Sequence, residues 1–467
     1  MTYAIKSEDV SFKYLHSEDP FLKEINLTIN KGETILICGA SGSGKTTFSR
    51  LINGISPNYV EGELSGKLKT FDLETGITAI EKYVPIVGSV FQNPKTQHFS
   101  VDTTSELAFP MENVGMDPER IRKGVKEKAE AFEIQHLLNH NIFELSGGEK
   151  QQIAFVSANM LEPQVLILDE VTSNLDQEAI QRIRKMVQEL KRLGMTIVIL
   201  EHRLAWTRGL VDRYVLFKEG TVNQEWSTSE FNQLSNRELH DLGLRSMDLS
   251  NHRKQIKAKR VKQHQSETGI LQTNQLSIGY KNQQVLDQLD LNFKSGQVTG
   301  LMGANGTGKS TLANTLTGLQ KPIAGSVLWD GHKMTAKELI NKSYLVMQDM
   351  NYQLFSDSVS EEVMLGAEYP EYIDEVIKTL NLSPYKERHP MALSEGQKQR
   401  VAIASALVSG KEIIIFDEPT SGLDYKHMYR FGQLLNDLKN SGAVVIVITH
   451  DEELASEWCD SIIELPK

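Results

Sequence analysis

Two glycine-rich loops, GASGSGKT at residues 39–46 and GANGTGKS at residues 303–310, have the residue types and spacing that clearly allow chemistry. Glycines at this spacing let the backbone curl so that its N–H groups point at phosphate oxygens, and the following helix adds its dipole. The lysine would bridge the outer phosphates, and the next hydroxyl could ligate Mg²⁺, so the sequence predicts two nucleoside triphosphate sites. The expected contact residues are Gly39, Ala40, Ser41, Gly42, Ser43, Gly44, Lys45, Thr46, Thr47, Gly303, Ala304, Asn305, Gly306, Thr307, Gly308, Lys309, Ser310 and Thr311.

Two acidic pairs supply the expected hydrolytic groups. Asp169 and Glu170 end the run VLILDE, and Asp417 and Glu418 end the run IIIFDE, so each pair follows the apolar residues of a predicted buried strand. In a parallel sheet of this class, that end of the strand lies beside the phosphate loop. We expect each aspartate to hold Mg²⁺ and each glutamate to orient or deprotonate the attacking water.

A histidine and a glutamine recur in each half of the chain. His202 and His450 follow apolar runs, and each stands 33 residues after its aspartate. This recurrence favours a ring N–H that donates to the γ-phosphate. Gln92 and Gln348 also follow apolar runs, and their similar placement makes them candidate Mg²⁺ ligands.

An aromatic residue precedes each phosphate loop. Tyr14 and Tyr280 could each stack on an adenine ring, and a packing role is equally compatible with the sequence. Both interpretations stay open at this point.

The whole set of residues occurs twice. From Ser146 to Asp169 to His202 the steps are 23 and 33 residues, and the corresponding steps that begin at Ser394 are again 23 and 33. Upstream of this part, the first copy carries two extra stretches of eight residues each. Repetition of this kind predicts two domains of one fold.

Short apolar runs alternate with polar, helix-prone stretches in both copies. Runs such as Thr34 to Cys38 and Ala443 to Ile448 are too short for helices and are typical of parallel strands buried on both faces. Stretches such as Glu178 to Arg192 are typical of crossover helices. The sequence therefore predicts an α/β fold, with two tandem P-loop domains that each hold a mostly parallel sheet.

The predicted boundaries are a first domain at residues 1–235, a linker at 236–268 and a second domain at 269–467. Within the linker, residues 250–266 hold six Lys or Arg and no acidic residue. A solvated tether is favoured over a segment that faces phospholipid or nucleic acid, because the rest of the chain is acidic.

The bulk composition excludes several classes of protein. With 467 residues and a net charge of −11, the chain argues against a nucleic acid partner. Two cysteines offer neither a disulfide framework nor a metal cluster, which favours a reducing cytoplasm. The N-terminus lacks a signal peptide and no apolar run approaches the roughly 20 residues of a spanning helix, so we expect neither a membrane span nor export.

The strings LSGGE at 145–149 and LSEGQ at 393–397, each followed by a helix-like run, resemble the ABC signature. With the features above, the resemblance to a tandem ABC ATPase covers nearly the whole chain. It implies ATP as the nucleotide and a helical subdomain beside the sheet of each copy. It also implies head-to-tail pairing, in which each ATP lies between one copy's phosphate loop and the other's signature helix. Closure with ATP would be the power stroke. The signature residues are Ser146, Gly147, Gly148, Glu149, Ser394, Glu395, Gly396 and Gln397.

Two further strings, FQNP at 91–94 and ILEHRL at 199–204, resemble the ATPases of energy-coupling factor importers for vitamins or transition-metal ions. This resemblance implies a peripheral protein at the cytoplasmic face of the cell membrane. Its partners would be an integral coupling (T) subunit, engaged near the glutamine loop, and a separate substrate-binding (S) subunit. Nothing in the sequence names the substrate.

One signature residue departs from the family pattern. Glu395 stands where glycine is usual, and the family geometry would set it opposite the phosphates at Lys45. A carboxylate near a γ-phosphate is electrostatically unfavourable. We therefore expect the site of Lys45 and Glu170 to be weaker than the site of Lys309 and Glu418.

Two other classes of protein compete with the importer interpretation. Soluble tandem ABC proteins that act on ribosomes share the doubled architecture, but they carry a longer, charged helical linker. DNA-repair ATPases of the same superfamily are disfavoured because the chain lacks zinc-type cysteine spacing and a basic surface signal.

Overall fold

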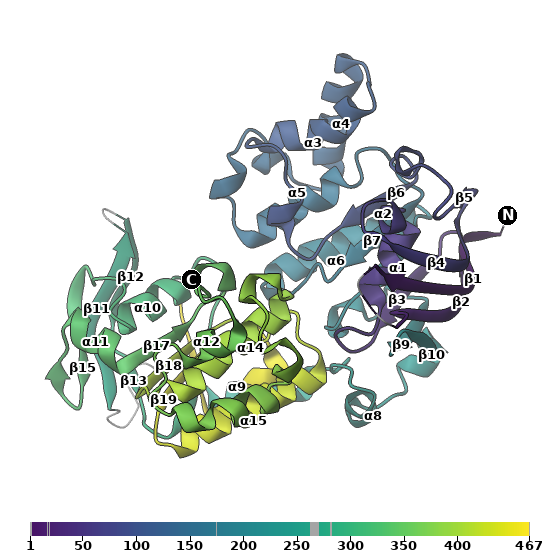
Figure 1. Cartoon of the computed structure of the whole chain (residues 1–467). Helices are drawn as coiled ribbons and strands as arrows, with labels where there is room; N and C mark the ends of the chain where they lie inside the picture. Colours follow the sequence, from purple (N-terminus) through teal and green to yellow (C-terminus); the bar gives the residue numbers. More distant parts are fainter. Residues whose placement is uncertain are drawn as a thin grey trace. The chain divides into compact units, whose positions relative to one another are not determined.

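The computed structural model describes residues 2–15, 17, 19–173, 175–261, 270–280 and 283–466, without the side chains of Lys95 and Glu395. The chain divides into two compact units, Met1–Asp248 with Asp424–Lys426, and Leu249–Leu423 with His427–Lys467 (Figure 1). Each unit contains one phosphate loop. None of the described helices is both long and apolar enough to cross a bilayer.

The first unit is built on a sheet of strand order β10-β9-β3-β8-β7-β6. Its parallel strands are buried on both faces, as the unbroken apolar runs predict. Helices pack on one face, and the antiparallel strands with one helix pack on the other. The antiparallel strands β2-β1-β4-β5 form a second sheet. The bounds are β1 Tyr3–Tyr14, β2 Leu22–Asn30, β3 Thr34–Cys38, β4 Gly62–Thr70, β5 Leu73–Glu74, β6 Val87–Val90, β7 Val165–Asp169, β8 Thr196–Leu200, β9 Arg213–Lys218 and β10 Thr221–Ser227.

The helices of the first unit fall into two groups. In Figure 1, α3, α4 and α5 lie together, apart from the antiparallel strands, and they form the expected helical subdomain. The other helices follow the core strands. The bounds are α1 Lys45–Ile52, α2 Ile55–Asn58, α3 Thr103–Asn113, α4 Pro118–Ala131, α5 Gly147–Ser157, α6 Gln177–Arg192, α7 Thr228–Phe231 and α8 Asn236–Asp241, with short 3-10 turns at Ile80–Lys82, Pro94–Thr96, Gln135–Leu137, Ile142–Glu144 and Ala205–Thr207.

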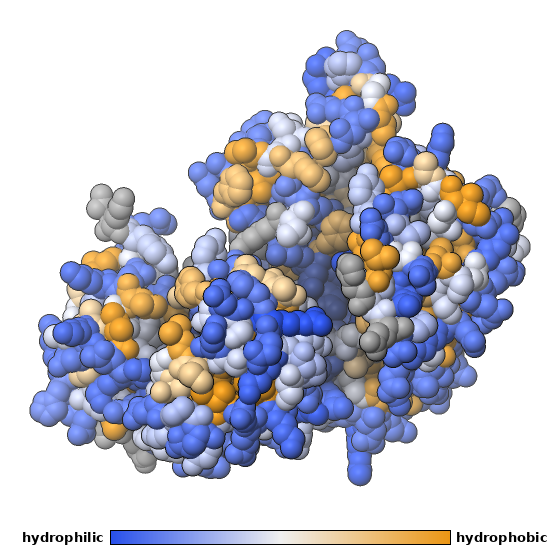
Figure 2. Space-filling model, in the orientation of Figure 1, coloured by the Kyte–Doolittle hydropathy of each residue, from blue (hydrophilic) through white to orange (hydrophobic). Residues whose placement is uncertain are grey.

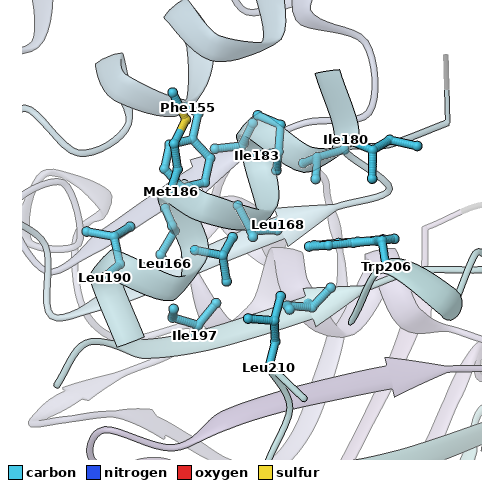
Figure 3. Close-up of a cluster of buried hydrophobic side chains, with 14 of the residues drawn as sticks. Phe155, Leu166, Leu168, Ile180, Ile183, Met186, Leu190, Ile197, Trp206 and Leu210 are labelled. Carbon is cyan, nitrogen blue, oxygen red and sulfur yellow. The ribbon is translucent and has the colours of Figure 1, made fainter. Parts of the chain in front are cut away.

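Helix α6 shows how sequence periodicity builds the core. Its apolar residues Ile180, Ile183, Met186 and Leu190 recur every three or four positions, so they form one stripe along the helix. Figure 3 shows this stripe packed over Leu166 and Leu168 of β7, with Phe155 of α5 beside it. Each such buried side chain stabilises the fold by about 1.5–3 kcal/mol.

The second unit repeats the plan. Its parallel sheet has the strand order β17-β18-β19-β14-β20, and its antiparallel strands have the order β12-β11-β15-β16, with β13 paired to β11. The expected α/β fold is therefore confirmed in both copies. The strand bounds are β11 Leu271–Tyr280, β12 Gln283–Leu289, β13 Asn292–Phe293, β14 Gln297–Met302, β15 Ala324–Trp329, β16 His332–Lys333, β17 Ser343–Val346, β18 Ile413–Asp417, β19 Val444–Ile448 and β20 Ser461–Glu464.

The helices of the second copy include short helices of the helical subdomain and a long helix after the catalytic strand. Their bounds are α9 Ser250–Lys259, α10 Lys309–Leu316, α11 Ala336–Lys342, α12 Val359–Met364, α13 Ile373–Thr379, α14 Glu395–Val408, α15 Tyr425–Asn440 and α16 Glu452–Trp458. Short 3-10 turns lie at Met350–Tyr352, Pro370–Tyr372, Ser383–Tyr385 and Pro390–Ala392.

The basic segment differs from its prediction. Residues 250–259 form helix α9, which packs on the second unit, rather than a solvated tether. His252 and Ile256, four positions apart, are both buried, and His252 Nδ1 lies 2.6 Å from Ser456 Oγ. Lys259 Nζ donates to the carbonyl oxygens of Ser456 and Cys459 at 2.6 and 2.7 Å, where α16 ends. Residues 262–269 lie outside the described part of the chain.

Candidate nucleotide sites

The first phosphate loop wraps around its own lysine. Lys45 Nζ donates to the carbonyl oxygens of Gly39 and Ala40 at 2.9 and 3.1 Å. Gly39 has a φ of 146°, and a Cβ there would meet the carbonyl oxygen of Phe217 at 2.2 Å, so only glycine fits. The loop thus joins β3 to α1 in the strand, loop and helix order that this motif requires.

The second phosphate loop has the same geometry. Lys309 Nζ donates to the carbonyl oxygens of Gly303 and Ala304 at 2.9 and 2.8 Å. The loop joins β14 to α10, and its last glycine, Gly308, has a φ of 89° at the start of the helix. Both loops therefore present a lysine and a helix N-terminus to a bound phosphate.

The predicted catalytic residues of the first copy come together. The hydroxyl of Thr46 donates to Asp169 Oδ1 at 3.3 Å. Glu170 Oε1 lies 3.0 Å from His202 Nε2, and Glu170 Oε2 accepts from Gln92 Nε2 at 3.0 Å. The structure thus joins Gln92 to the predicted water-activating glutamate, and its role as a Mg²⁺ ligand stays a prediction.

The charges of this cluster are strongly coupled. Burial, with the neighbouring carboxylate of Glu170, raises the pKa of Asp169 to about 7, although the Thr46 hydroxyl opposes the shift. Burial also raises the pKa of Glu170, but the contact with His202 outweighs it and leaves that pKa below its ordinary value. Burial lowers the pKa of Lys45, against the attraction of Glu170 and Asp169. Glu170 is therefore a carboxylate at neutral pH, as a water-orienting group must be.

The second copy brings together the corresponding residues with different contacts. Ser310 Oγ donates to Asp417 Oδ2 at 2.6 Å. His450 Nε2 lies 3.5 Å from Glu418 Oε1 and 3.0 Å from Asn305 Oδ1. Burial raises the pKa of Asp417, against the bond from Ser310. Gln348 follows β17 and is exposed.

The backbone at both predicted catalytic glutamates is strained. Glu170 has a φ of 49° and Glu418 a φ of 52°, in the left-handed region that favours glycine. Strain of this kind costs about 1–3 kcal/mol and is usually found at functional sites. The strain occurs at the same position of both copies, as it also does at Asp9 with Gln275, so the catalytic role of the two glutamates stays a prediction.

The donors beside each loop fit a Mg²⁺ ion. Each site offers a hydroxyl bonded to a buried carboxylate, Thr46 with Asp169 and Ser310 with Asp417, which are the oxygen ligands that Mg²⁺ prefers. Burial and the charge of Glu170 raise the pKa of Asp169, and a divalent cation bound beside it would stabilise its negative charge. The described residues contain no group of three or more His, Cys, Asp or Glu suited to a metal. Mg²⁺ would therefore take its other ligands from phosphate oxygens and water.

The two tyrosines lie against the helices that follow the loops. Tyr14 Oη is 2.7 Å from Thr47 Oγ1, and Thr311 Oγ1 donates to Tyr280 Oη at 3.3 Å. Tyr280 is 57% exposed. The contacts place both rings at the nucleotide loops, and adenine stacking stays a prediction.

The signature segments begin helices α5 and α14. In the first copy, the hydroxyl and N–H of Ser146 both donate to Glu149 Oε2, at 2.7 and 2.8 Å. In the second copy, the N–H of Ser394 donates to Gln397 Oε1 at 2.9 Å. These capping bonds fix the start of each helix. The side chain of Glu395, on which the predicted inequality of the two sites rests, lies outside the described side chains.

Two buried acids that the sequence did not single out support the histidine segments. Glu201 Oε2 accepts from the hydroxyl of Thr172 at 2.8 Å, and Asp451 Oδ2 accepts from that of Thr420 at 2.8 Å. Glu201 precedes its histidine and Asp451 follows the other, so the repeat spacing does not reveal them. Their common signal is an acid directly beside the histidine.

Comparisons with known proteins agree with this geometry. The sequence model of a family described as ABC transporter matches residues 22–173 and 286–421. A Treponema denticola protein named "Putative ABC transporter ATP-binding protein" is 39% identical over 470 residues, which are 99% of this chain and 95% of that protein. A Bacillus subtilis protein named "Putative HMP/thiamine import ATP-binding protein" is 31% identical over 490 residues, with coverage of 98% and 89%.

A solved structure described as "Model of ribosome-bound archaeal Pelota and ABCE1" contains a chain with a similar fold. The TM-score is 0.68 with 21% identity, over 97% of this chain and 76% of that chain. At this identity, the likeness concerns the tandem ATPase fold alone.

Proposed function

Since this chain belongs to the ABC transporter family and is an ATPase with two ABC domains, we propose that it powers a membrane importer of the energy-coupling factor type. The observation that carries the proposal is the Bacillus subtilis relative. Its name assigns it to HMP/thiamine import, and the similarity extends over 98% of this chain. The FQNP and EHRL strings support the same class of protein.

We assign the chemistry of the first site to the cluster around Glu170. Glu170 is a carboxylate that lies 3.0 Å from His202 and accepts a hydrogen bond from Gln92, and it would orient or deprotonate the attacking water. Lys45, with the N–H groups of its loop, would hold the outer phosphates. Mg²⁺ on Thr46 and Asp169 would supply positive charge to the transferred phosphoryl group.

The second site would act in the same way through its own residues. Glu418 would orient or deprotonate water, and His450 would donate to the γ-phosphate. Lys309 would hold the outer phosphates, while Ser310 and Asp417 would carry Mg²⁺.

An exposed phenylalanine lies seven residues after each predicted site glutamine, Gln92 or Gln348, and supports a membrane partner. Phe99 is 75% exposed and Phe355 is 72% exposed, at corresponding positions of the two copies. Figure 2 shows apolar side chains among polar ones on the face over α3 and α5. Exposed aromatic side chains commonly anchor a protein partner. We assign these two residues to contact with an integral coupling (T) subunit, while a separate S subunit would select the substrate.

The test is purification from membranes of the source cell in mild detergent. We expect a polytopic coupling subunit, identified by mass spectrometry, to accompany the full-length chain. Phe99→Ser with Phe355→Ser should abolish this association and leave ATPase activity unchanged. Leu193→Ser is the control, because Leu193 is 66% exposed at the end of α6. Sedimentation with ribosomes, without a membrane subunit, would refute the importer proposal.

The substrate class follows from uptake assays with the assembled complex. Labelled thiamine, its pyrimidine precursor, Co²⁺ and Ni²⁺ are the first candidates, given the relative and the family resemblance. ATP-dependent accumulation of one of them, lost in a Glu170→Gln/Glu418→Gln variant, would identify the cargo. Failure of all four would leave the ATPase assignment intact and refute this choice of cargo.

A further inference from the structure

The loops between each glutamine and the helical subdomain keep the same side chains in two otherwise divergent copies. Residues 92–106 and 348–362 both span fifteen positions, and only five are identical. One is the pair Gln92 and Gln348, already assigned to the sites. The other four pairs are Gln97 with Gln353, Phe99 with Phe355, Ser100 with Ser356 and Glu106 with Glu362.

The second glutamine closes the loop onto the strand that precedes it. In the first copy, Gln97 Oε1 accepts the N–H of Phe91 at 3.0 Å, and Gln97 Nε2 donates to the carbonyl of Ser89 at 2.9 Å. In the second copy, Gln353 makes the same pair of bonds, to the N–H of Met347 at 2.9 Å and the carbonyl of Leu345 at 2.8 Å. Each bonded N–H belongs to the residue directly before Gln92 or Gln348.

The buried glutamate holds the far end of the same loop. Glu106 Oε2, on α3, accepts the N–H groups of Phe99 and Ser100 at 2.9 and 2.8 Å. Glu362 Oε2, on α12, accepts those of Phe355 and Ser356 at 2.8 and 2.7 Å. Both carboxylates are buried, so each backbone group would lose its partner if the acid were removed.

In each copy, the helix that begins at the signature segment also forms a hydrogen bond with the backbone of this glutamate. The hydroxyl of Ser157, at the end of α5, donates to the carbonyl oxygen of Glu106 at 3.3 Å. The hydroxyl of Ser405 on α14 donates to the carbonyl oxygen of Glu362 at 3.2 Å. The glutamine loop is therefore connected at one end to the core sheet and at the other to the helical subdomain.

We propose that Gln97 and Glu106, with Gln353 and Glu362, are positioning residues for ATP hydrolysis. They fix the backbone on both sides of Gln92 and Gln348, so that the Gln92 amide reaches Glu170. In the first copy, Gln97 and Glu106 bond the backbone at residues 89, 91, 99 and 100, and Gln92 in turn bonds Glu170. Their effect on catalysis therefore passes through the first glutamine. Loss of the positioning residues should therefore slow hydrolysis rather than weaken ATP binding.

The test is a double-mutant cycle in the full-length chain, with each substitution made in both copies. Gln97→Ala/Gln353→Ala should lower kcat at least threefold and change the KM for ATP less than twofold. The same substitutions added to Gln92→Ala/Gln348→Ala should have no further effect, because their action requires the first glutamine. Thr96→Ala is the control, since the Thr96 hydroxyl donates to the carbonyl of Asn93 within its own turn.

Conservative variants keep the test decisive if the alanine variants fold poorly. Gln97→Glu retains the acceptor for the Phe91 N–H and loses the donor to Ser89, so it should lower kcat less than alanine. Glu106→Gln retains an oxygen that can accept both N–H groups and should keep most of the activity that Glu106→Ala loses. An additive effect in the cycle, a rise in KM at constant kcat, or full activity of Gln97→Ala/Gln353→Ala would overturn the proposal.

Discussion

Replacement of Gly148 by alanine should loosen the first signature helix. Gly148 is the second residue of α5, and it is buried against Ala179 of α6. A Cβ at Gly148 would lie 2.7 Å from the Cβ of Ala179, well inside ordinary van der Waals contact. To remove this steric overlap, α5 and α6 have to move apart, because both contacting atoms are Cβ atoms, which cannot rotate away.

Two opposing contributions set the change in the free energy of unfolding caused by Gly148→Ala. Overpacking of a core contact destabilises a fold by about 1–3 kcal/mol, whereas replacement of a helical glycine by alanine stabilises it by about 0.5–1 kcal/mol. We therefore expect Gly148→Ala to destabilise the first domain by about 1 kcal/mol. For a domain of this size, that change lowers the melting temperature by about 2–4 °C.

The chain offers two matched controls. A Cβ at Gly147 would meet no atom within 4 Å, and one at Gly396 would lie 3.9 Å from the nearest atom, on Leu423. Gly147→Ala and Gly396→Ala should thus be neutral or stabilising. Thermal unfolding of the full-length chain, monitored by calorimetry, measures all three. Equal melting temperatures for Gly147→Ala and Gly148→Ala would refute the packing argument.

Three other predictions concern catalysis, thiols and the basic helix. Glu418→Gln should lower ATPase activity more than Glu170→Gln, as the expected inequality of the sites requires; an equal or larger effect of Glu170→Gln would contradict that inequality. Burial raises the pKa of Cys38 and Cys459 to about 12, so both should resist a thiol reagent at pH 8 and react after unfolding in guanidinium; labelling of the native chain would show that they are accessible. Lys259→Met should destabilise the second domain by about 1 kcal/mol, measured by urea unfolding, because the end of α16 loses two hydrogen bonds; an unchanged midpoint would mean that water replaces them.

The sequence predicted the phosphate loops and catalytic strands well because their determinants are local. In the loop at residues 39–46, one strand, one glycine turn and one helix follow each other directly, so the motif contains its own structural context. The parallel sheets follow from runs that are too short and too apolar for other elements. The repeat spacing singled out His202 as a donor to the γ-phosphate, which stays a prediction, and the structure places its Nε2 3.0 Å from Glu170 Oε1, a contact that the spacing did not predict.

The features that escaped prediction depend on partners distant in the sequence. The segment at residues 250–259 is polar by composition, and only its docking on α16 provides burial for His252 and Ile256. Gln97 and Glu106 resemble ordinary polar residues in the sequence until their bonds to backbone N–H groups are known. A comparison of the two copies, position by position after Gln92 and Gln348, would have revealed both.

The left-handed backbone at Glu170 and Glu418 limits how this enzyme can be stabilised. Glycine would adopt a φ of 49° or 52° without a side-chain penalty, so replacement of either glutamate by glycine would relieve strain while it removed the group assigned to activate water. Selection for thermal stability alone would therefore favour inactive chains at these two positions. Any laboratory evolution of this protein has to select for ATP turnover and stability together.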